Sequence, residues 1–163
     1  MLQSDPCLAQ SVVKTPPGSD VFLLRFEDHL ADLLLELDVS ILELARHVVL
    51  SRGKRIRPLL CFFCGSDKAD ITPDLLNASA ILELVHVATL VHDDIIDQSD
   101  VRRGVTTLHS FAGEHTSILL GDALFSFALD PHWIVLKRKY GVSYYENSSL
   151  YKCILFIYSM VDN

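Results

Sequence analysis

Positive charge is scarce in this sequence. Its 163 residues include 14 lysines and arginines against 21 aspartates and glutamates, which gives a net charge of −7. Because binding to a phosphate backbone depends on basic surface, this balance argues against general nucleic-acid binding. Only 21% of the residues are charged and 50% are hydrophobic, so we expect a globular chain rather than a disordered one. The length allows one domain with a proper core.

Cysteines are few, and only two of them are close in sequence. The four are Cys7, Cys61, Cys64 and Cys153. Cys61 and Cys64 lie inside an apolar run, so we interpret them as core-facing free thiols and not as a disulfide or zinc pair. Unpaired cysteines favour a reducing compartment. We therefore expect an intracellular protein, with the cytoplasm favoured and an organelle left open.

Targeting and membrane signals are absent as well. No basic segment leads into an apolar one near the first residue, so we expect no secretory signal peptide. No window of about 18 residues is both apolar and uncharged, so no transmembrane segment is expected. Residues 1–19 contain three prolines and a glycine and are interpreted as a loose N-terminal tail.

Helical periodicity of apolar residues is present instead. It predicts a helix over residues 20–37 and a second over residues 41–51, where Ser40 and Glu43 have the form of a capping box. The second helix should stop at Gly53, and a short apolar helix should cover residues 58–65. These helices are expected to pack as neighbours.

A long helix is predicted next. Thr72 can cap it, Pro73 suits its first position, and no glycine or proline interrupts it before Asp97. About 25 residues at 1.5 Å each span roughly 37 Å, a length that suits the central helix of a bundle. A last helix is predicted over residues 115–129, with Gly121 allowing close helix packing. The fold class is therefore expected to be all-α, an antiparallel helix bundle.

Carboxylates gather where the long helix ends. One face of that helix carries Leu82, His86, Thr89, Asp93 and Asp97. Asp93 and Asp97 are one turn apart, a spacing that suits metal ions with oxygen ligands. Acidic side chains at a helix C-terminus are unfavourable by roughly 0.3–1 kcal/mol each, so nearby cations are expected. The alternative is a solvated acidic helix end that pairs with Arg102 or Arg103.

A basic segment precedes the short apolar helix. Four of the six residues 52–57 are lysine or arginine, and Pro58 suits the first turn of the next helix. The free N–H groups and the dipole of a helix start favour anions, so a diphosphate would suit this segment. The alternative is a solvated basic turn.

Three motifs occur in a fixed order: GKRIRP at residues 53–58, HDDIID at 92–97 and VRRG at 101–104, with ELVHVATL at 83–90 before the second. Together they resemble the polyprenyl synthetase family, the head-to-tail trans-prenyltransferases that make farnesyl, geranylgeranyl and longer polyprenyl diphosphates. The similarity covers about residues 20–129. It implies a helix bundle of the isoprenoid synthase type and an enzyme that joins isopentenyl diphosphate to an allylic prenyl diphosphate with the help of Mg²⁺.

The resemblance also implies roles for individual residues. The metal ligands would be Asp93, Asp94 and Asp97, with Asp93 and Asp97 as the catalytic pair. The residues that bind isopentenyl diphosphate would be Lys54, Arg57, His86 and Arg103, and Arg102 would contact the allylic diphosphate. Ala88 and Thr89 would form the floor of the pocket for the growing chain. Their small size favours a medium- to long-chain product over a C15 one.

Some features depart from the family pattern. Thr106 stands where the family usually has a proline, which should loosen that turn without removing a ligand, and residues 1–163 contain no second aspartate-rich motif. From residue 130 onward no family motif is present, so we interpret residues 130–163 as an atypical C-terminal tail. We therefore expect a truncated synthase, the N-terminal part, that is weakly active or inactive alone.

Two alternatives stay open at this point. The first is a non-catalytic truncated isoform that dimerises through its helices with a full-length synthase and modulates it; more generally, a homodimer or heterodimer through the helices is expected. The second is an HD-type metal phosphohydrolase, in which His92 and Asp93 would be metal ligands. The second alternative would leave GKRIRP without a role.

Overall fold

The computed structural model describes residues 17–51, 53–65 and 70–129. Over these ranges the chain forms six helices and one two-stranded hairpin, and this confirms the all-α helix bundle. In chain order the elements are α1 (Ser19–Leu34), α2 (Val39–Val49), α3 (Ile56–Gly65), α4 (Pro73–Ile96), β1 (Val101–Arg102), β2 (Val105–Thr106), α5 (Leu108–Ala112) and α6 (Glu114–Ala128).

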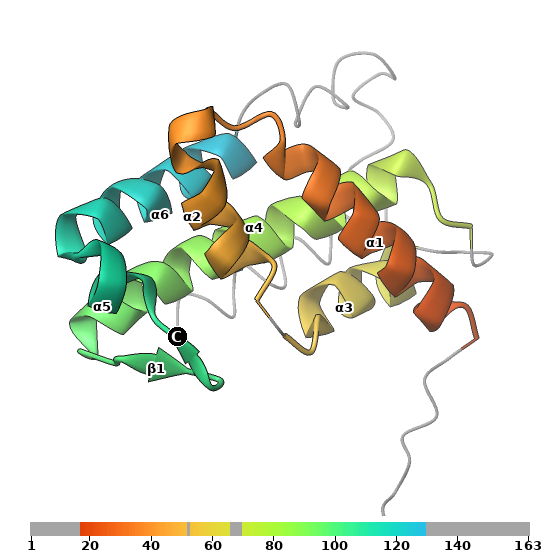
Figure 1. Cartoon of the computed structure of the whole chain (residues 1–163). Coiled ribbons are helices and arrows are strands. Elements are labelled where there is room, and N and C mark those ends of the chain that lie inside the picture. The colour runs from red at the N-terminus through yellow and green to blue at the C-terminus, as the bar shows by residue number, and fades with distance from the viewer. Residues whose placement is uncertain (1–16, 52, 66–69, 130–163) are drawn as a thin grey trace, which may run out of the picture.

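The 24-residue helix α4 is the centre of the bundle. It crosses the whole molecule in Figure 1, α6 runs antiparallel beside it, and α1, α2 and α3 also contact it. A helix that is apolar on most sides is stable only when neighbours cover it, and 11 of the 24 α4 residues are buried in this way. By length and composition alone α4 could cross a membrane, but 56% of its most apolar window is buried, as in a core helix.

Helix α1 supplies the other large part of the core. Phe22, Phe26, Leu30 and Leu34 recur every fourth residue and are fully buried. This spacing places them on one face of the helix. Phe22 stacks on Phe62 of α3 with ring centroids 4.6 Å apart. The aromatic contact therefore joins α1 to the helix that follows the basic segment.

The helix ends show which local signals were interpreted correctly. The Thr72 hydroxyl accepts a hydrogen bond from the Leu75 N–H at 3.2 Å, as predicted for the cap of α4. The cap of α2 is Asp38, whose carboxylate accepts from the Ser40 N–H at 2.8 Å. The prediction of Ser40 as the cap was therefore wrong, because the helix begins at Val39 and Ser40 already lies in its first turn.

Two further boundaries differ from the prediction. Helix α1 ends at Leu34 and not at residue 37, because the next three N–H groups donate to carbonyls three residues back and form tight turns. Helix α3 begins at Ile56, two residues before Pro58, which still falls in its first turn.

The segment after α4 contains structure that the sequence pattern did not predict. Strands β1 and β2 pair antiparallel around a two-residue turn, in which Arg103 and Gly104 have φ values of 53° and 79°. Left-handed residues at both positions match the twist of a tight hairpin. The short helix α5 follows, and Gly113 with φ 84° separates it from α6.

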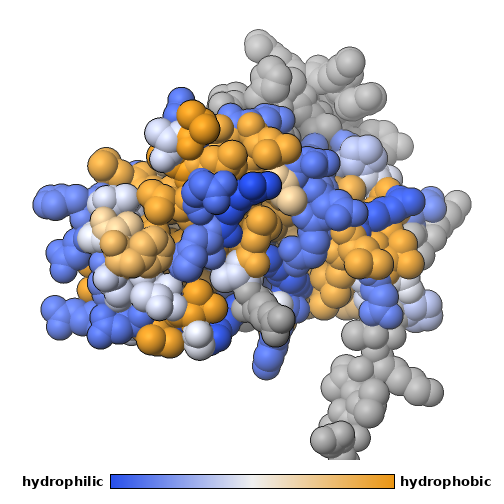
Figure 2. Space-filling view, in the orientation of Figure 1, coloured by the Kyte–Doolittle hydropathy of each residue, from blue (hydrophilic) through white to orange (hydrophobic). Residues whose placement is uncertain are grey.

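The described surface mixes apolar and polar side chains. Figure 2 shows hydrophobic areas over the part of the molecule where α1 and α2 lie, with hydrophilic surface between them. Exposed apolar side chains include Leu24, Val39 and Leu119. The predicted tail over residues 130–163 and residues 1–16 of the predicted N-terminal tail lie outside the described residues, as do Cys7 and Cys153. Cys61 and Cys64 are free thiols, as predicted.

Candidate functional site

The basic segment and the hairpin meet on the face of α4 that carries His86. They surround an open cavity of about 530 Å³. Its lining residues are Gly53, Lys54, Arg55, Ile56, Arg57, Glu83, His86 and Arg103. Three segments that are far apart in the sequence therefore contribute cationic or imidazole side chains to one cavity. The four residues predicted to bind isopentenyl diphosphate, namely Lys54, Arg57, His86 and Arg103, all line it.

Gly53 and Arg103 explain how the basic segment and the hairpin come so close. A Cβ atom at Gly53 would lie 2.8 Å from Arg103 Nη1, which is closer than a Cβ contact allows. The missing side chain thus lets the guanidinium of the hairpin turn lie against the backbone of the basic segment. Arg103 has a left-handed backbone conformation, and its side chain lies beside Gly53.

His86 lies among the arginines of the cavity. Burial, followed by the positive charges of Arg57, Arg103 and Arg102, lowers the pKa of His86 to about 4. The imidazole is therefore neutral at pH 7, when it can donate one N–H to an anion without adding to the charge. The same charges attract any anion that enters the cavity.

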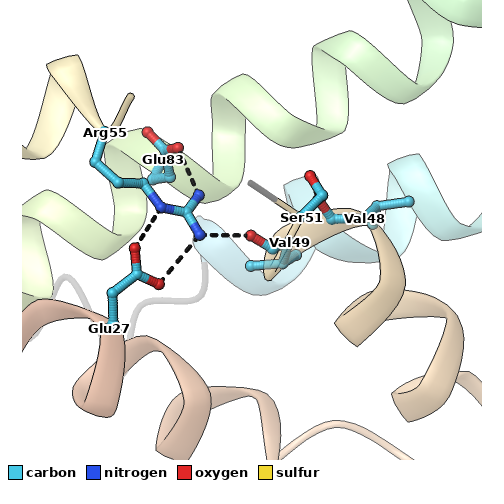
Figure 3. A network of polar contacts seen from close by, with 6 residues as sticks. All are labelled: Glu27, Val48, Val49, Ser51, Arg55 and Glu83. Carbon is cyan, nitrogen blue, oxygen red and sulfur yellow. Dashed lines mark hydrogen bonds and ion pairs between the residues drawn. The ribbon is translucent and has the colours of Figure 1, made fainter. Parts of the chain in front are cut away.

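Arg55 has a different surrounding from the cations beside it (Figure 3). Its Nε and Nη2 donate to the two carboxylate oxygens of Glu27 at 2.6 and 3.1 Å, and Nη1 donates to Glu83 at 2.9 Å. Nη2 also donates to the Val49 carbonyl at 3.0 Å. The guanidinium is 7% exposed. The interpretation of the whole segment as an anion-binding loop was therefore wrong for Arg55, which holds α1, α2 and α4 together.

The carboxylates at the end of α4 have separate environments. Asp94 is buried and accepts a 2.5 Å hydrogen bond from Arg102 Nε on β1. Asp93 and Asp97 are exposed, and the Asp97 N–H donates to the Asp93 carbonyl at 2.8 Å, so one helical turn joins them. Asp94 is thus engaged in an ion pair, whereas Asp93 and Asp97 present exposed carboxylates.

A narrower cavity of about 60 Å³ links the two ends of this face. Its lining includes Glu83, His86 and Arg103, which it shares with the larger cavity, as well as Asp94 and Arg102. Asp93 and Asp97 line neither cavity. The basic segment is therefore connected through His86 and Arg103 with Asp94 and Arg102, while Asp93 and Asp97 lie beside this region on the last turn of α4.

Two exposed carboxylates one turn apart suit a hard divalent cation, because Mg²⁺ is usually held by one or two carboxylates and completed by water and phosphate oxygens. In the described residues no group of three or more His, Cys, Asp or Glu side chains is gathered around a metal position. The donor set fits Mg²⁺ only as a partial site, in which further ligands come from a bound anion.

Comparisons with known proteins identify the family of the chain. A family model described as polyprenyl synthetase matches residues 38–143, well over half of the chain. The chain belongs to the polyprenyl synthetase family. This confirms the resemblance inferred from GKRIRP, HDDIID and VRRG.

The relatives of this polyprenyl synthetase chain include two prenyl diphosphate synthases. It is 38% identical over 103 residues to geranylgeranyl pyrophosphate synthase 12, chloroplastic, of Arabidopsis thaliana, which covers 60% of this chain and 28% of that protein. It is 37% identical over 111 residues to the short chain isoprenyl diphosphate synthase of Methanocaldococcus jannaschii, which covers 68% and 34%. The chain thus spans about a third of the length of these curated relatives.

Solved structures show which fold the helix bundle has. The heptaprenyl diphosphate synthase from Staphylococcus aureus superposes with a TM-score of 0.65 and 30% identity, over 74% of this chain and 38% of that one. The geranylgeranyl pyrophosphate synthetase from Geoglobus acetivorans superposes with a TM-score of 0.64 and 26% identity, over 88% and 44%. The helix bundle is therefore of the isoprenoid synthase type.

The residues predicted to set product length are packed into α4. Ala88 is 1% exposed, and Thr89 is half-buried with its hydroxyl donating to the His86 carbonyl at 2.7 Å. Neither lines the two cavities described above. Their role in this polyprenyl synthetase chain stays a prediction, which the product length of a Thr89→Phe variant in an active assembly would check.

His92, the histidine of the HD-type alternative, joins α4 to α6. Its Nε2 lies 3.3 Å from the Ile118 carbonyl and 3.6 Å from Asp122 Oδ1. A Cβ atom at Gly121 would lie 2.2 Å from the same nitrogen. The prediction that Gly121 allows close helix packing is confirmed. The imidazole of His92 on α4 occupies the space where a side chain at this position of α6 would lie.

Sequence reasoning missed Glu83 and Arg55 as parts of this region. A signal was available, because Glu83 stands among apolar residues in the middle of the long helix α4. A carboxylate that is buried there needs a cationic partner. The pattern predicts that a partner exists, but it does not say which of the four cations in residues 52–57 is the partner.

Proposed function

We propose that the cavity between residues 53–57, α4 and the hairpin binds the diphosphate group of isopentenyl diphosphate in a prenyl-transfer reaction. The observation that carries this proposal is the convergence of Lys54, Arg57, His86 and Arg103 on one cavity from three segments of the chain. A hydrogen bond to a charged group contributes about 1.5–3 kcal/mol, so a few such bonds in a partly enclosed cavity are enough for specific anion binding.

The relatives support the reaction class, because they are prenyl diphosphate synthases. In that chemistry the C–O bond of an allylic diphosphate breaks, and diphosphate leaves with the electron pair. The double bond of isopentenyl diphosphate then forms the new C–C bond, and a proton is lost. The residues of the cavity would hold the diphosphate of the second substrate, so that its double bond is positioned for attack.

We propose that Asp93 and Asp97 hold Mg²⁺ together with the oxygens of the allylic diphosphate. When bound, the metal neutralises charge on the departing diphosphate. Asp94 holds Arg102 instead, which keeps that guanidinium at the boundary between the acidic helix end and the cavity. Fixed positive charge at this place would stabilise negative charge that develops as the bond breaks.

Isothermal titration with inorganic pyrophosphate tests the anion site in metal-free buffer at low ionic strength. Arg57→Ala should weaken binding about tenfold or more, because one charge-assisted hydrogen bond is lost. The matched control is Arg25→Ala, which removes an exposed arginine of α1 and should leave the affinity nearly unchanged. Equal weakening by both variants would mean nonspecific charge attraction and would contradict the proposal.

The metal part is tested by repeating the titration with Mg²⁺. We expect Mg²⁺ to strengthen pyrophosphate binding, and Asp97→Ala to remove most of the gain. Asp74→Ala, at the opposite end of α4, should keep it. If both variants keep the full gain, the acidic helix end does not hold the metal.

A further inference from the structure

Arg55 lies between two residues of the proposed anion site and also lines the cavity, but its guanidinium donates to protein groups. Lys54 is exposed at the cavity, and Arg57 is half-buried in its wall. Arg55 is buried and uses four hydrogen bonds to reach Glu27 on α1, Glu83 on α4 and the Val49 carbonyl on α2. The residue between the two anion-binding cations is therefore an anchor to three helices, as Figure 3 shows.

The backbone of Arg55 transmits this anchoring to its neighbours. Arg55 has φ 46°, in the left-handed region that residues other than glycine rarely adopt. Such a conformation persists only where the surroundings fix it. The Arg55 carbonyl also accepts the Leu59 N–H at 3.1 Å and so begins α3, which carries Arg57 in its first turn. Fixing Arg55 thus fixes Lys54 before it and Arg57 after it.

Charge gives Arg55 a second effect. Glu83 lines both cavities and lies one turn before His86 on α4. Its buried carboxylate would repel a diphosphate if it were not compensated. The ion pair at 2.9 Å with Arg55 neutralises it.

We propose that Arg55 is a positioning residue for diphosphate binding. Its hydrogen bonds to Glu27 and Glu83 fix the backbone that orients Lys54 and Arg57, and its charge shields the anion from the carboxylate of Glu83. This inference rests on the proposed function, because it concerns the same cavity. In this proposal Arg55 does not bind the diphosphate, because its hydrogen bonds go to Glu27, Glu83 and the Val49 carbonyl. The planar guanidinium is essential, since a lysine keeps the charge but cannot bind Glu27 with two parallel hydrogen bonds.

The sharpest test is Glu27→Gln, because positioning and plain electrostatics predict opposite signs. Glu27 lies on α1 and lines neither cavity, so the variant leaves the cavity wall intact. Removing a negative charge should strengthen pyrophosphate binding if charge alone matters. Loss of the paired hydrogen bonds between Arg55 and Glu27 should weaken pyrophosphate binding if positioning matters. We expect a three- to tenfold weaker affinity for inorganic pyrophosphate in the full chain, measured by isothermal titration with folding checked by thermal unfolding.

Asp28→Asn is the matched control. It removes an exposed carboxylate from the next position of α1 and should leave the affinity equal or slightly higher. Arg55→Lys is the second variant and should bind pyrophosphate about tenfold more weakly. If Glu27→Gln binds as tightly as Asp28→Asn, and Arg55→Lys loses only thermal stability, Arg55 is merely structural and the inference is overturned.

The same titrations separate this inference from the proposed function. If Arg57→Ala binds pyrophosphate as well as the unchanged chain, the anion site itself is wrong, whatever the Glu27 variant does. If Arg57→Ala weakens binding and Glu27→Gln does not, the site stands and only the positioning role fails.

Discussion

The two ends of the candidate site differ in how they are built. At the cation-lined end, side chains from the basic segment, α4 and the hairpin are gathered around one cavity, and a buried ion-pair network supports them. At the carboxylate end, Asp93 and Asp97 are adjacent only because one turn of α4 joins them, and both are exposed. The first arrangement depends on tertiary structure and the second depends on the helix alone.

This difference has a functional meaning. Bringing like charges together in a partly buried cavity is unfavourable, so the protein must fix them with counter-charges before a ligand arrives. Exposed carboxylates on a helix need no such support, because water solvates them until a cation binds. We therefore expect the cation-lined end to be preorganised and the carboxylate end to be completed by its ligands.

The largest expected contrast is between two carboxylates of the same helix. Glu83→Ala removes one of the two acidic partners of buried Arg55, and breaking a buried pair costs about 3–5 kcal/mol, reduced here by the remaining bond to Glu27. Asp97→Ala should change the unfolding free energy by less than about 1 kcal/mol, and in the stabilising direction, because it removes negative charge from a helix C-terminus. Urea unfolding of both variants measures the contrast. Similar losses of unfolding free energy in the two variants would contradict the proposed difference between the two ends of the site.

The second prediction concerns the packing that holds the carboxylate end in place. Gly121→Ala should destabilise by about 1–3 kcal/mol, because the new methyl group would meet His92. In a His92→Ala background the same change should stabilise by up to about 1 kcal/mol, because alanine favours helix over glycine. A double-mutant cycle of thermal or urea unfolding gives the coupling.

Ser126→Ala is the control for that cycle. It lies on the exposed side of α6 and should change stability by less than about 0.5 kcal/mol. If Gly121→Ala destabilises equally with and without His92, the imidazole is not what excludes the side chain. The carboxylate end would then need another explanation for its position.

The comparison also explains what could be predicted from the sequence. Helical periodicity placed His86, Asp93 and Asp97 on one face of α4, and the Thr72 cap and the unbroken length followed from local signals. These features involve residues within a few turns of one another, so short-range rules decide them. The family resemblance rested on the same contiguous motifs.

The features that were missed all involve contacts between distant segments. The inward turn of Arg55 depends on Glu27 and Glu83, which lie 28 residues away on either side. The hairpin depends on two left-handed residues, one of them an arginine, which the sequence does not mark as a turn residue. Residue spacing shows that four cations are close together, but only the fold decides which of them is buried in an ion pair.

The smallest predicted effect concerns pH and the cation-lined end. The pKa of His86 is lowered from 6.5 to about 4 in the folded chain, chiefly by burial and then by Arg57, Arg103 and Arg102. The folded state therefore binds fewer protons than the unfolded state between these values. The stability that depends on neutral His86 is fully present above about pH 6.5 and is lost as the pH falls towards 4.

His86→Asn removes this titration, so the unchanged chain should lose more unfolding free energy than the variant between pH 6.5 and 4, while the difference between them stays constant above pH 6.5. Glu83, which lines both cavities, and Asp94, which lines the narrower one, are present in both proteins, so the difference isolates the imidazole. His115→Asn, at an exposed position of α6, is the control and should follow the unchanged chain. Parallel curves for His86→Asn and the unchanged chain would mean that neither burial nor the arginines lower the pKa of His86, and that the cation-lined end is less compact than its geometry indicates.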